Sequence, residues 1–259
     1  MKCACELSTA ANTSEAIAEV LERVASGMAG TQGDLALVFS SMHHAEALGR
    51  LSAEIRERGL AKHVLGCTAE SVVGNDREVE LATALCVWSI QLPGAMLQPI
   101  RLNWEHTGFR STPDGLEPES LAGRTLLLLA DPFSFPAEDW LKLLNSAQPP
   151  ARVLGGMASG AQAAGKNRLV LDTDVYSLGA VGIVIDGPVA IKSVVSQGCR
   201  PIGKPTIVTR AEGNVLHELG RRPALEVLRE QFASLDQEDQ AKVQDGLHLG
   251  RVIYEFHDS

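Results

Sequence analysis

The sequence contains few aromatic residues, no excess of basic residues and no long apolar run. Phe, Trp and Tyr make up 4% of the 259 residues, which disfavours the aromatic platforms on which single-stranded nucleic acids stack. Lys and Arg number 23 against 32 Asp and Glu, for a formal net charge of −9, so the basic footprint of a protein that binds DNA, RNA or anionic membranes is missing. No run approaches the roughly 18 apolar residues of a spanning helix. We therefore expect neither a nucleic-acid nor a membrane partner.

Cysteine is too sparse and too unevenly spaced for a disulfide framework. The five cysteines are Cys3, Cys5, Cys67, Cys86 and Cys199, and an odd, irregular set in a chain of this length indicates free thiols in a reducing compartment. The first two form a Cys-x-Cys without further ligands nearby, so we expect no metal site. The N-terminus has no apolar core typical of a secretory signal. We predict a cytoplasmic protein that needs no metal and no cofactor.

What the chain does contain is apolar periodicity of two kinds, which predicts a mixed α/β fold. Residues 13–28 have helical spacing, with Asn12 or Thr13 as the N-cap. The apolar runs at 35–39 and 126–130 are nearly continuous, as expected of strands buried on both faces. A hydrophobic content of 45% is ample for a sizeable core in one or two domains.

The order of these elements recurs along the chain. Residues 35–41 correspond to 126–132, each a buried strand followed by a polar turn and a helix. Val64-Leu65-Gly66 then corresponds to Val153-Leu154-Gly155. Matching order together with short sequence matches indicates a duplication.

We predict two tandem β-α-β-β-β repeats, at about 34–102 and 125–192, in which the strand at 97–101 matches 188–192. The segment 103–120 contains Pro and Gly turn signals and is predicted to be a linking loop. The predicted fold is therefore α/β (mixed α+β), with central sheets, helices outside and a C-terminal helical extension.

One motif approaches a nucleotide-binding loop without completing it. Residues 160–167 include Gly-Lys, but Asn167 replaces the Ser or Thr that would hold magnesium. The following residues, 169–171, favour a strand, whereas a phosphate-binding loop must lead into a helix. We interpret the segment as a loop of small residues.

Two cysteines are candidate nucleophiles. Cys199 precedes Arg200, and a neighbouring Arg together with turn amides can lower a thiol pKa; Cys67 follows a strand and Gly66. No His and Asn or Asp partners accompany either, and cysteine is among the most often buried residues. Thiol catalysis is therefore the minority interpretation.

Two glycine-containing segments, Gly66-Cys67-Thr68 and residues 155–160, occupy equivalent places in the predicted repeats. We expect turns whose exposed amides hold an anion such as a carboxylate. Arg200 offers a planar fork for the same carboxylate, and Glu70 or Asp131 would accept an ammonium group. The candidate ligand-binding residues are Gly66, Cys67, Thr68, Glu70, Asp131, Gly155, Gly156, Ser159, Gln197, Cys199 and Arg200.

The longest distinctive stretch is residues 195–203, Val-Ser-Gln-Gly-Cys-Arg-Pro-Ile-Gly, followed by 211–219 and Arg222-Pro223-Ala224-Leu225. With the segments at 35–41, 64–69 and 153–156, these motifs resemble the FIST family of small-ligand sensory domains. The resemblance implies a non-enzymatic sensory role, with amino acids as the usual suggested ligands and a signalling output module as a frequent partner. The resemblance covers about residue 34 to the chain end and implies a FIST N-like domain at 34–215 and the start of an incomplete FIST C-like domain at 216–259. The preceding segment, 1–33, is predicted from its helical spacing to be an N-terminal helix that leads into the first repeat.

We therefore expect a small-ligand sensor for amino acids or similar small carboxylates in intracellular signalling, with an unidentified output partner. Two alternatives from other classes stay open: a thiol-dependent acyl-transfer enzyme that uses Cys67 or Cys199, and a protein-interaction scaffold without a small ligand. Rapid alkylation of either thiol near neutral pH favours the enzyme. A melting temperature that no ligand raises favours the scaffold.

Overall fold

The computed structural model describes residues 1–105, 108–112, 118–146, 148–194, 201–213, 215–245, 247 and 249–250. The chain divides into two compact units, Met1–Ser193 and Val194–Ser259.

The first sheet of the N-terminal unit has six strands. In spatial order they are β1 (Cys3–Ser8), β6 (Leu85–Ile90), β2 (Gly33–Ser40), β3 (Ala61–Thr68), β11 (Leu169–Leu171) and β12 (Asp174–Tyr176). β2 and β3 are parallel and every other neighbouring pair is antiparallel. The sequence pattern predicts only a helix in the first 33 residues, so β1 is an element that it does not predict.

The second sheet has five strands, in the order β10 (Arg152–Met157), β9 (Thr125–Ala130), β13 (Ala180–Asp186), β7 (Met96–Glu105) and β8 (Gly108–Thr112). β9 and β10 are parallel, and the remaining pairs are antiparallel. The prediction of a loop over 103–120 is wrong in its first part, because β7 continues to Glu105 and β8 pairs with it. β8 is an edge strand, and an edge strand needs no continuous apolar run.

Three helices cover these sheets. α1 (Thr13–Met28) begins where Asn12 Oδ1 accepts hydrogen bonds from the amides of Ser14 and Glu15, which satisfies two of the free donors at its start. The helix predicted after residues 35–41 begins as a 3-10 turn, η1 (Met42–Ala47), and continues as α2 (Leu48–Glu57). The corresponding helix of the second half is α3 (Ala137–Asn145). The remaining elements are the hairpin β4 (Ser71–Gly74) and β5 (Arg77–Glu80), and the 3-10 turn η2 (Pro118–Leu121).

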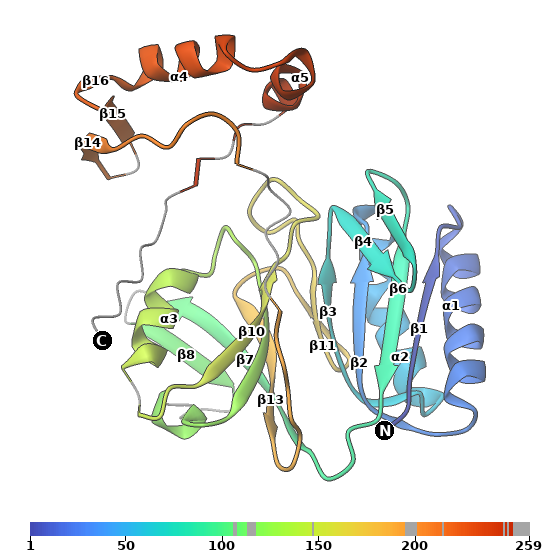
Figure 1. Ribbon diagram of the computed structural model, residues 1–259. Helices are drawn as coiled ribbons and strands as arrows, with labels where there is room; N and C mark the ends of the chain where they lie inside the picture. Colours follow the sequence, from blue (N-terminus) through green and yellow to red (C-terminus); the bar gives the residue numbers. More distant parts are fainter. Residues whose placement is uncertain are drawn as a thin grey trace. The chain divides into compact units, whose positions relative to one another are not determined.

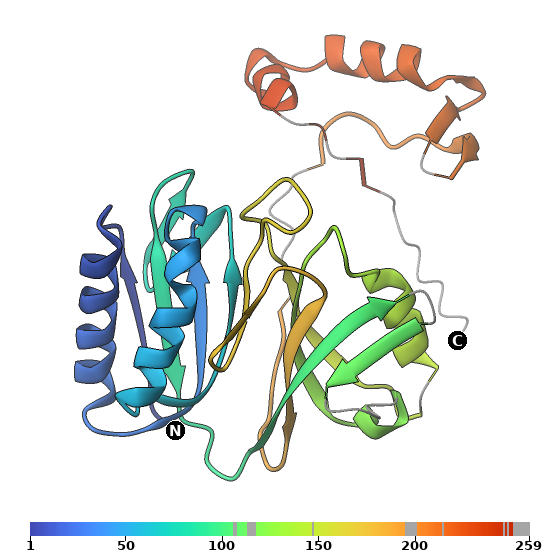
Figure 2. The same ribbon diagram turned by 180° about the vertical axis from the view of Figure 1, so that it is seen from behind.

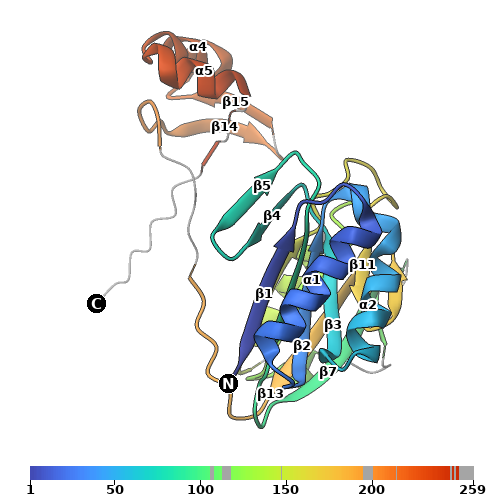
Figure 3. The same ribbon diagram turned by 90° about the vertical axis from the view of Figure 1, so that its right-hand side faces the viewer.

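The two sheets face one another, with α1 and α2 outside the first and α3 outside the second (Figures 1 and 2). Figure 3 shows α1 and α2 side by side on one face of the first sheet. Three hydrophobic clusters fill the layers: one joins α1 and α2 to the first sheet, one lies between the sheets, and one joins α3 to the second sheet. The predicted arrangement of central sheets with helices outside is confirmed.

The two sheets share a pattern of strand pairing. Each contains a parallel pair flanked by an antiparallel strand, as β6-β2-β3 and β13-β9-β10, so residues 35–39 and 126–130 hold the same place in the two orders. One predicted match is wrong, because residues 97–101 lie in β7 whereas 188–192 contain no strand. The tandem repeat itself stays a prediction.

The second unit contains a three-stranded sheet and two helices. β14 (Val208–Glu212), β15 (Val215–Leu219) and β16 (Arg222–Pro223) pair in that order, and Leu219, Ala224 and Val227 form a small core with α4 (Ala224–Ala233). α5 (Gln237–Asp245) follows, and Asp236 Oδ1 accepts the amide hydrogen of Asp239 in its first turn. β14 and β15 pair across the domain boundary predicted at residue 215, and the interpretation of 216–259 as the start of a FIST C-like domain stays a prediction.

No helix in the described part of the chain is long and apolar enough to cross a membrane.

Candidate functional site

A buried cluster of polar side chains lies where β3, β9 and β10 end. Asn167 stands at its centre and is fully buried, as are Thr68 and Asp131. The Asn167 amide nitrogen donates to Asp131 Oδ1 at 3.1 Å and to the Ala158 carbonyl at 3.3 Å. Its Oδ1 accepts from Thr68 Oγ1 at 3.1 Å and from the Ala161 amide at 3.0 Å. We call Thr68, Asp131, Ser134 and Asn167 the strand-end cluster.

This cluster joins the two sheets. Thr68 ends β3 in the first sheet, and Asp131 directly follows β9 in the second. Asp131 Oδ2 also accepts from Ser134 Oγ at 2.6 Å, and Ser134 Oγ in turn accepts from the Gly179 amide at 2.9 Å. Because buried polar groups are costly unless they are hydrogen-bonded, this satisfied network holds the strand ends in one arrangement.

Two of the predicted site residues thus meet through a residue that the sequence analysis did not select. Thr68 and Asp131 both bond to Asn167, whereas Ser159 lies at the surface and its Oγ accepts from the amide of Glu70 at 3.1 Å. The Glu70 side chain is exposed. The predicted role of Asp131 as an ammonium acceptor stays a prediction, and it would require Asn167 or Ser134 to move.

Gly66 and Gly155 lie inside strands, not in the turns that the sequence analysis predicted. Gly66 pairs with Val38, and a Cβ at residue 66 would lie 2.3 Å from the Val38 carbonyl oxygen. Gly155 pairs with Leu128, has a φ of +140°, and would bring a Cβ to 1.8 Å from the Leu128 carbonyl oxygen. The close approach of neighbouring backbones is therefore the structural reason for glycine at both positions.

The remaining predicted residues have different surroundings. Cys67 is 3% exposed and packs in the cluster between the sheets; burial raises the pKa of its thiol to about 12, which leaves it protonated near neutral pH. Gly156 is exposed, and a Cβ there would meet no atom within 4 Å. Gln197, Cys199 and Arg200 lie outside the described residues.

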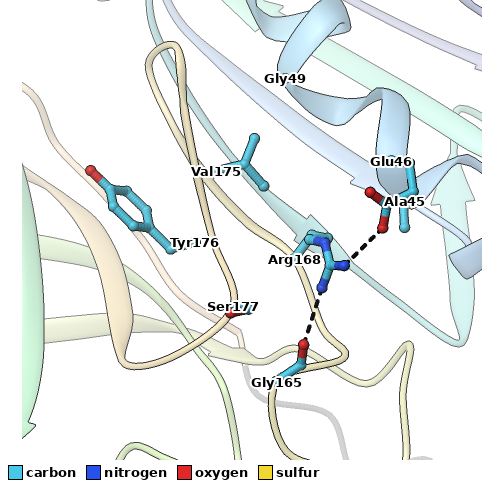
Figure 4. Close-up of a pocket in the computed structure, with 8 residues that line it drawn as sticks. All are labelled: Ala45, Glu46, Gly49, Gly165, Arg168, Val175, Tyr176 and Ser177. Carbon is cyan, nitrogen blue, oxygen red and sulfur yellow. Dashed lines mark hydrogen bonds and ion pairs between the residues drawn. The ribbon is translucent and has the colours of Figure 1, made fainter.

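A pocket of about 350 Å³ opens beside the strand-end cluster (Figure 4). η1 and the first turn of α2 form one wall, and β12 with the residue after it forms another. We call it the Arg168 pocket, and it is lined by Ala45, Glu46, Gly49, Gly165, Arg168, Val175, Tyr176 and Ser177.

Arg168 supplies the positive charge of this pocket. Its Nη1 lies 3.1–3.2 Å from the carbonyl oxygens of Gly165, Lys166 and Asn167, which fix the guanidinium plane. Its Nη2 donates to Glu46 Oε1 at 2.8 Å. The Arg168 side chain is 24% exposed and that of Glu46 is 84% exposed, so the pair contributes little to stability.

The other lining residues are small, apolar or turned aside. Tyr176 directs its ring away from Arg168 (Figure 4), and Arg101 Cζ lies 3.9 Å from the centroid of that ring. Val175 and Gly49 are close, since a Cβ at Gly49 would be 3.2 Å from Val175 Cγ2. The pocket therefore combines the fixed guanidinium of Arg168 and its Glu46 partner with a short apolar wall and the Ser177 hydroxyl.

The Arg168 pocket and the strand-end cluster share backbone. The Arg168 amide donates to Thr68 Oγ1 at 3.0 Å, and the Thr68 amide donates to the Arg168 carbonyl at 2.9 Å. The backbone of Arg168 is therefore hydrogen-bonded directly to the end of β3, next to Asn167. Among the residues that the structure describes, no group of three or more His, Cys, Asp or Glu is placed to hold a metal ion.

The fold and this site define a mixed α+β domain with a small polar pocket beside the carboxyl ends of its parallel strands, which is where open α/β sheets bind ligands. The family model of the FIST N domain matches residues 34–222. The chain belongs to the FIST family, whose domain is generally a sensory domain in signalling.

Relatives of the chain are found in mycobacteria. The uncharacterized protein Rv0628c of Mycobacterium tuberculosis (strain H37Rv) is 36% identical over 249 residues, which cover 96% of this chain and 64% of the relative. The uncharacterized protein Mb0898c of Mycobacterium bovis is 33% identical over 247 residues, which cover 95% and 63%. The chain thus spans slightly less than two thirds of the length of these relatives.

Proposed function

We propose that this chain is a non-enzymatic sensory domain that acts in the cytoplasm and binds amino acids or similar small carboxylates in the Arg168 pocket. The single observation that supports this most directly is the guanidinium of Arg168, which three backbone carbonyls hold in place at the pocket wall. A planar, fixed guanidinium is the preferred partner of a carboxylate.

The Glu46 contact supports the same ligand chemistry. A carboxylate already sits 2.8 Å from Arg168 Nη2, so the geometry for such a partner exists at this place. Because the Glu46 side chain is 84% exposed, little packing is lost when it leaves. A ligand carboxylate that takes its position exchanges one charge-assisted hydrogen bond for another.

A sensory role also requires that occupancy of the pocket change something elsewhere. Asn167 follows directly after Lys166 and precedes Arg168, and its side chain bonds to Thr68 and Asp131 at the ends of strands in different sheets. A ligand that draws on Arg168 therefore acts on the hydrogen bonds that join the two sheets. The output partner that would read such a change is unidentified.

A thermal-shift screen of the purified chain against the amino acids and small mono- and dicarboxylates tests the proposal. A ligand at 100 times its Kd stabilises the folded state by about 2.7 kcal/mol, a rise in Tm of roughly 5–10 °C for a chain of this size. Arg168→Lys should weaken binding by about tenfold or more, because a point charge replaces the fork. Arg23→Lys, at an exposed ion pair on α1, is the matched control and should bind as the wild type does.

Two results would count against this function. If no carboxylate raises the Tm of the wild-type chain, the scaffold alternative gains. If Arg168→Lys binds a hit with unchanged affinity, the ligand occupies another site. The enzyme alternative receives no support from Cys67, whose buried thiol has a pKa of about 12.

A further inference from the structure

Two cysteine thiols on neighbouring strands, neither of which lines the Arg168 pocket, lie in contact with each other. Cys5 Sγ in β1 is 3.7 Å from Cys86 Sγ in β6. In the antiparallel register Cys5 lies opposite Trp88 and Leu7 opposite Cys86, so the two cysteines are diagonal neighbours. Side chains two residues apart on a strand share a face, and both thiols therefore project from the same face of the first sheet.

The surroundings give the two thiols unequal access to solvent. Cys5 is partly exposed, whereas Cys86 is 2% exposed and packs with Leu7, Val72 and Ala84 under the β4–β5 hairpin. Burial, followed by the influence of Cys5 and Glu6, raises the pKa of the Cys86 thiol to about 12. A soluble oxidant therefore reaches Cys5 first. The thiol of Cys86 stays protonated and lies next to that of Cys5.

We propose that Cys5 and Cys86 form a redox site that hydrogen peroxide converts into a disulfide between β1 and β6. The Cys5 thiolate attacks one peroxide oxygen, the O–O bond breaks, and the departing hydroxide takes up a proton to become water. Cys86 Sγ then attacks the sulfur of the Cys5 sulfenic acid; the S–S bond forms, the S–O bond breaks, and the hydroxide leaves as water with the Cys86 proton. The two thiols lose two electrons, and the peroxide is reduced to two waters.

Because the two sulfur atoms are already in contact, they need to move only a short way to form the disulfide. The sulfur atoms must approach from 3.7 Å to a bond length of about 2.05 Å, which rotation of the two side chains and a small strand shift supply. β1 is an edge strand whose sheet neighbour in the described residues is β6, so no second strand holds its other edge. Once formed, the bond fixes the edge strand β1 to β6, which also pairs with β2.

Peptide mapping of the native chain after treatment with hydrogen peroxide tests the proposal. Free thiols are then blocked under denaturing conditions and the digest is analysed without reductant. We expect a linked Cys5–Cys86 peptide pair, two hydrogens lighter than the reduced pair, which dithiothreitol separates again. We also expect the oxidised chain to melt about 5 °C or more above the reduced chain, because the bond closes a long loop of the unfolded state.

Cys3→Ser is the matched control, because Cys3 lies on the same strand and is exposed; this variant should still form the Cys5–Cys86 bond and show the same Tm shift. Cys5→Ser and Cys86→Ala should lose both. If Cys86→Ala does not fold, Cys5→Ser, at a partly exposed position, decides alone. The proposal is overturned if Cys5 and Cys86 stay free while Cys3 is oxidised, or if the main linkage joins other cysteines.

Discussion

The side-chain amide of Asn167 donates a hydrogen bond to Asp131 Oδ1 over 3.1 Å, and through it the loop before β11 is tied to the end of β9. Asn167 also accepts from Thr68 at the end of β3. Three segments far apart in the sequence therefore depend on one buried amide. Because Asn167 precedes Arg168 in the sequence, these hydrogen bonds lie directly beside the proposed ligand pocket.

Asn167→Ala should destabilise the chain by about 3 kcal/mol. The substitution removes the side-chain amide, so Asp131 Oδ1 loses this donor and the Thr68 hydroxyl loses its acceptor. An unsatisfied buried polar group costs about 1–3 kcal/mol. The midpoint of urea unfolding measures the loss. Asn145→Ala, at an exposed position at the end of α3, should change stability by less than about 0.5 kcal/mol; equal effects of the two variants would contradict a central role for Asn167.

The sequence predicted the strands that are buried on both faces better than those at sheet edges. Residues 35–39 and 126–130 are continuous apolar runs because layers cover them on two sides, and such runs are visible without any structure. β1 and β8 are edge strands with mixed composition. Their pairing depends on partners about 80 residues away or on a hairpin without an apolar pattern, so no local signal marked them.

The candidate site was predicted in part for a similar reason. Asp131 is a candidate because it follows a strand, and position after a buried strand is readable from the sequence. Thr68 is a candidate because it belongs to the glycine-containing segment 66–68. Asn167 and Arg168 acquire their roles only because β11 pairs with β3, which no local pattern indicates. In the sequence, Asn167 stands out only as a departure from a nucleotide-binding motif, whereas the structure places it at the centre of the strand-end cluster.

Adjacent glycines in β10 offer a paired test of backbone packing. Gly155→Ala should destabilise the chain by at least about 2 kcal/mol, because its φ of +140° and a Cβ 1.8 Å from the Leu128 carbonyl oxygen require the strands to separate. Gly156→Ala should be neutral within about 0.5 kcal/mol, since a Cβ there meets nothing within 4 Å. Thermal unfolding of the two variants side by side measures the contrast, and a similar loss in both would show that β10 is not held as described.

Stability should fall as the pH decreases through the range in which His44 titrates. Burial, followed by the charge of His43, lowers the pKa of His44 below its usual 6.5, against the opposing effect of the Ala10 carbonyl. The unfolded chain therefore takes up a proton on this residue at a higher pH than the folded chain does, and the free energy of unfolding decreases from about pH 6.5 downward.

His44→Gln should flatten this part of the pH profile, measured as Tm between pH 7.5 and 5. The matched control is His43→Gln, at an exposed position, which should keep most of the slope. A wild-type profile that is flat through this range would contradict the lowered pKa. A hydrogen bond of 2.9 Å between Thr13 Oγ1 and His44 Nδ1 links His44 to the first turn of α1. We therefore expect protonation of His44 to loosen the start of α1 before the rest of the fold.

Alkylation of the native chain tests whether the thiol of Cys67 has any enzymatic character. Its pKa of about 12 and its burial between the sheets leave almost no thiolate near neutral pH, and the thiolate is the reactive species. With iodoacetamide at pH 7.5, we expect exposed Cys3 to be modified within minutes and Cys67 to react only after denaturation, as mapped by mass spectrometry of the digested chain. Cys3 thus serves as the internal control for reagent and time. Modification of Cys67 as fast as that of Cys3 would show that the strand end opens to solvent, and would return the thiol-dependent enzyme to consideration.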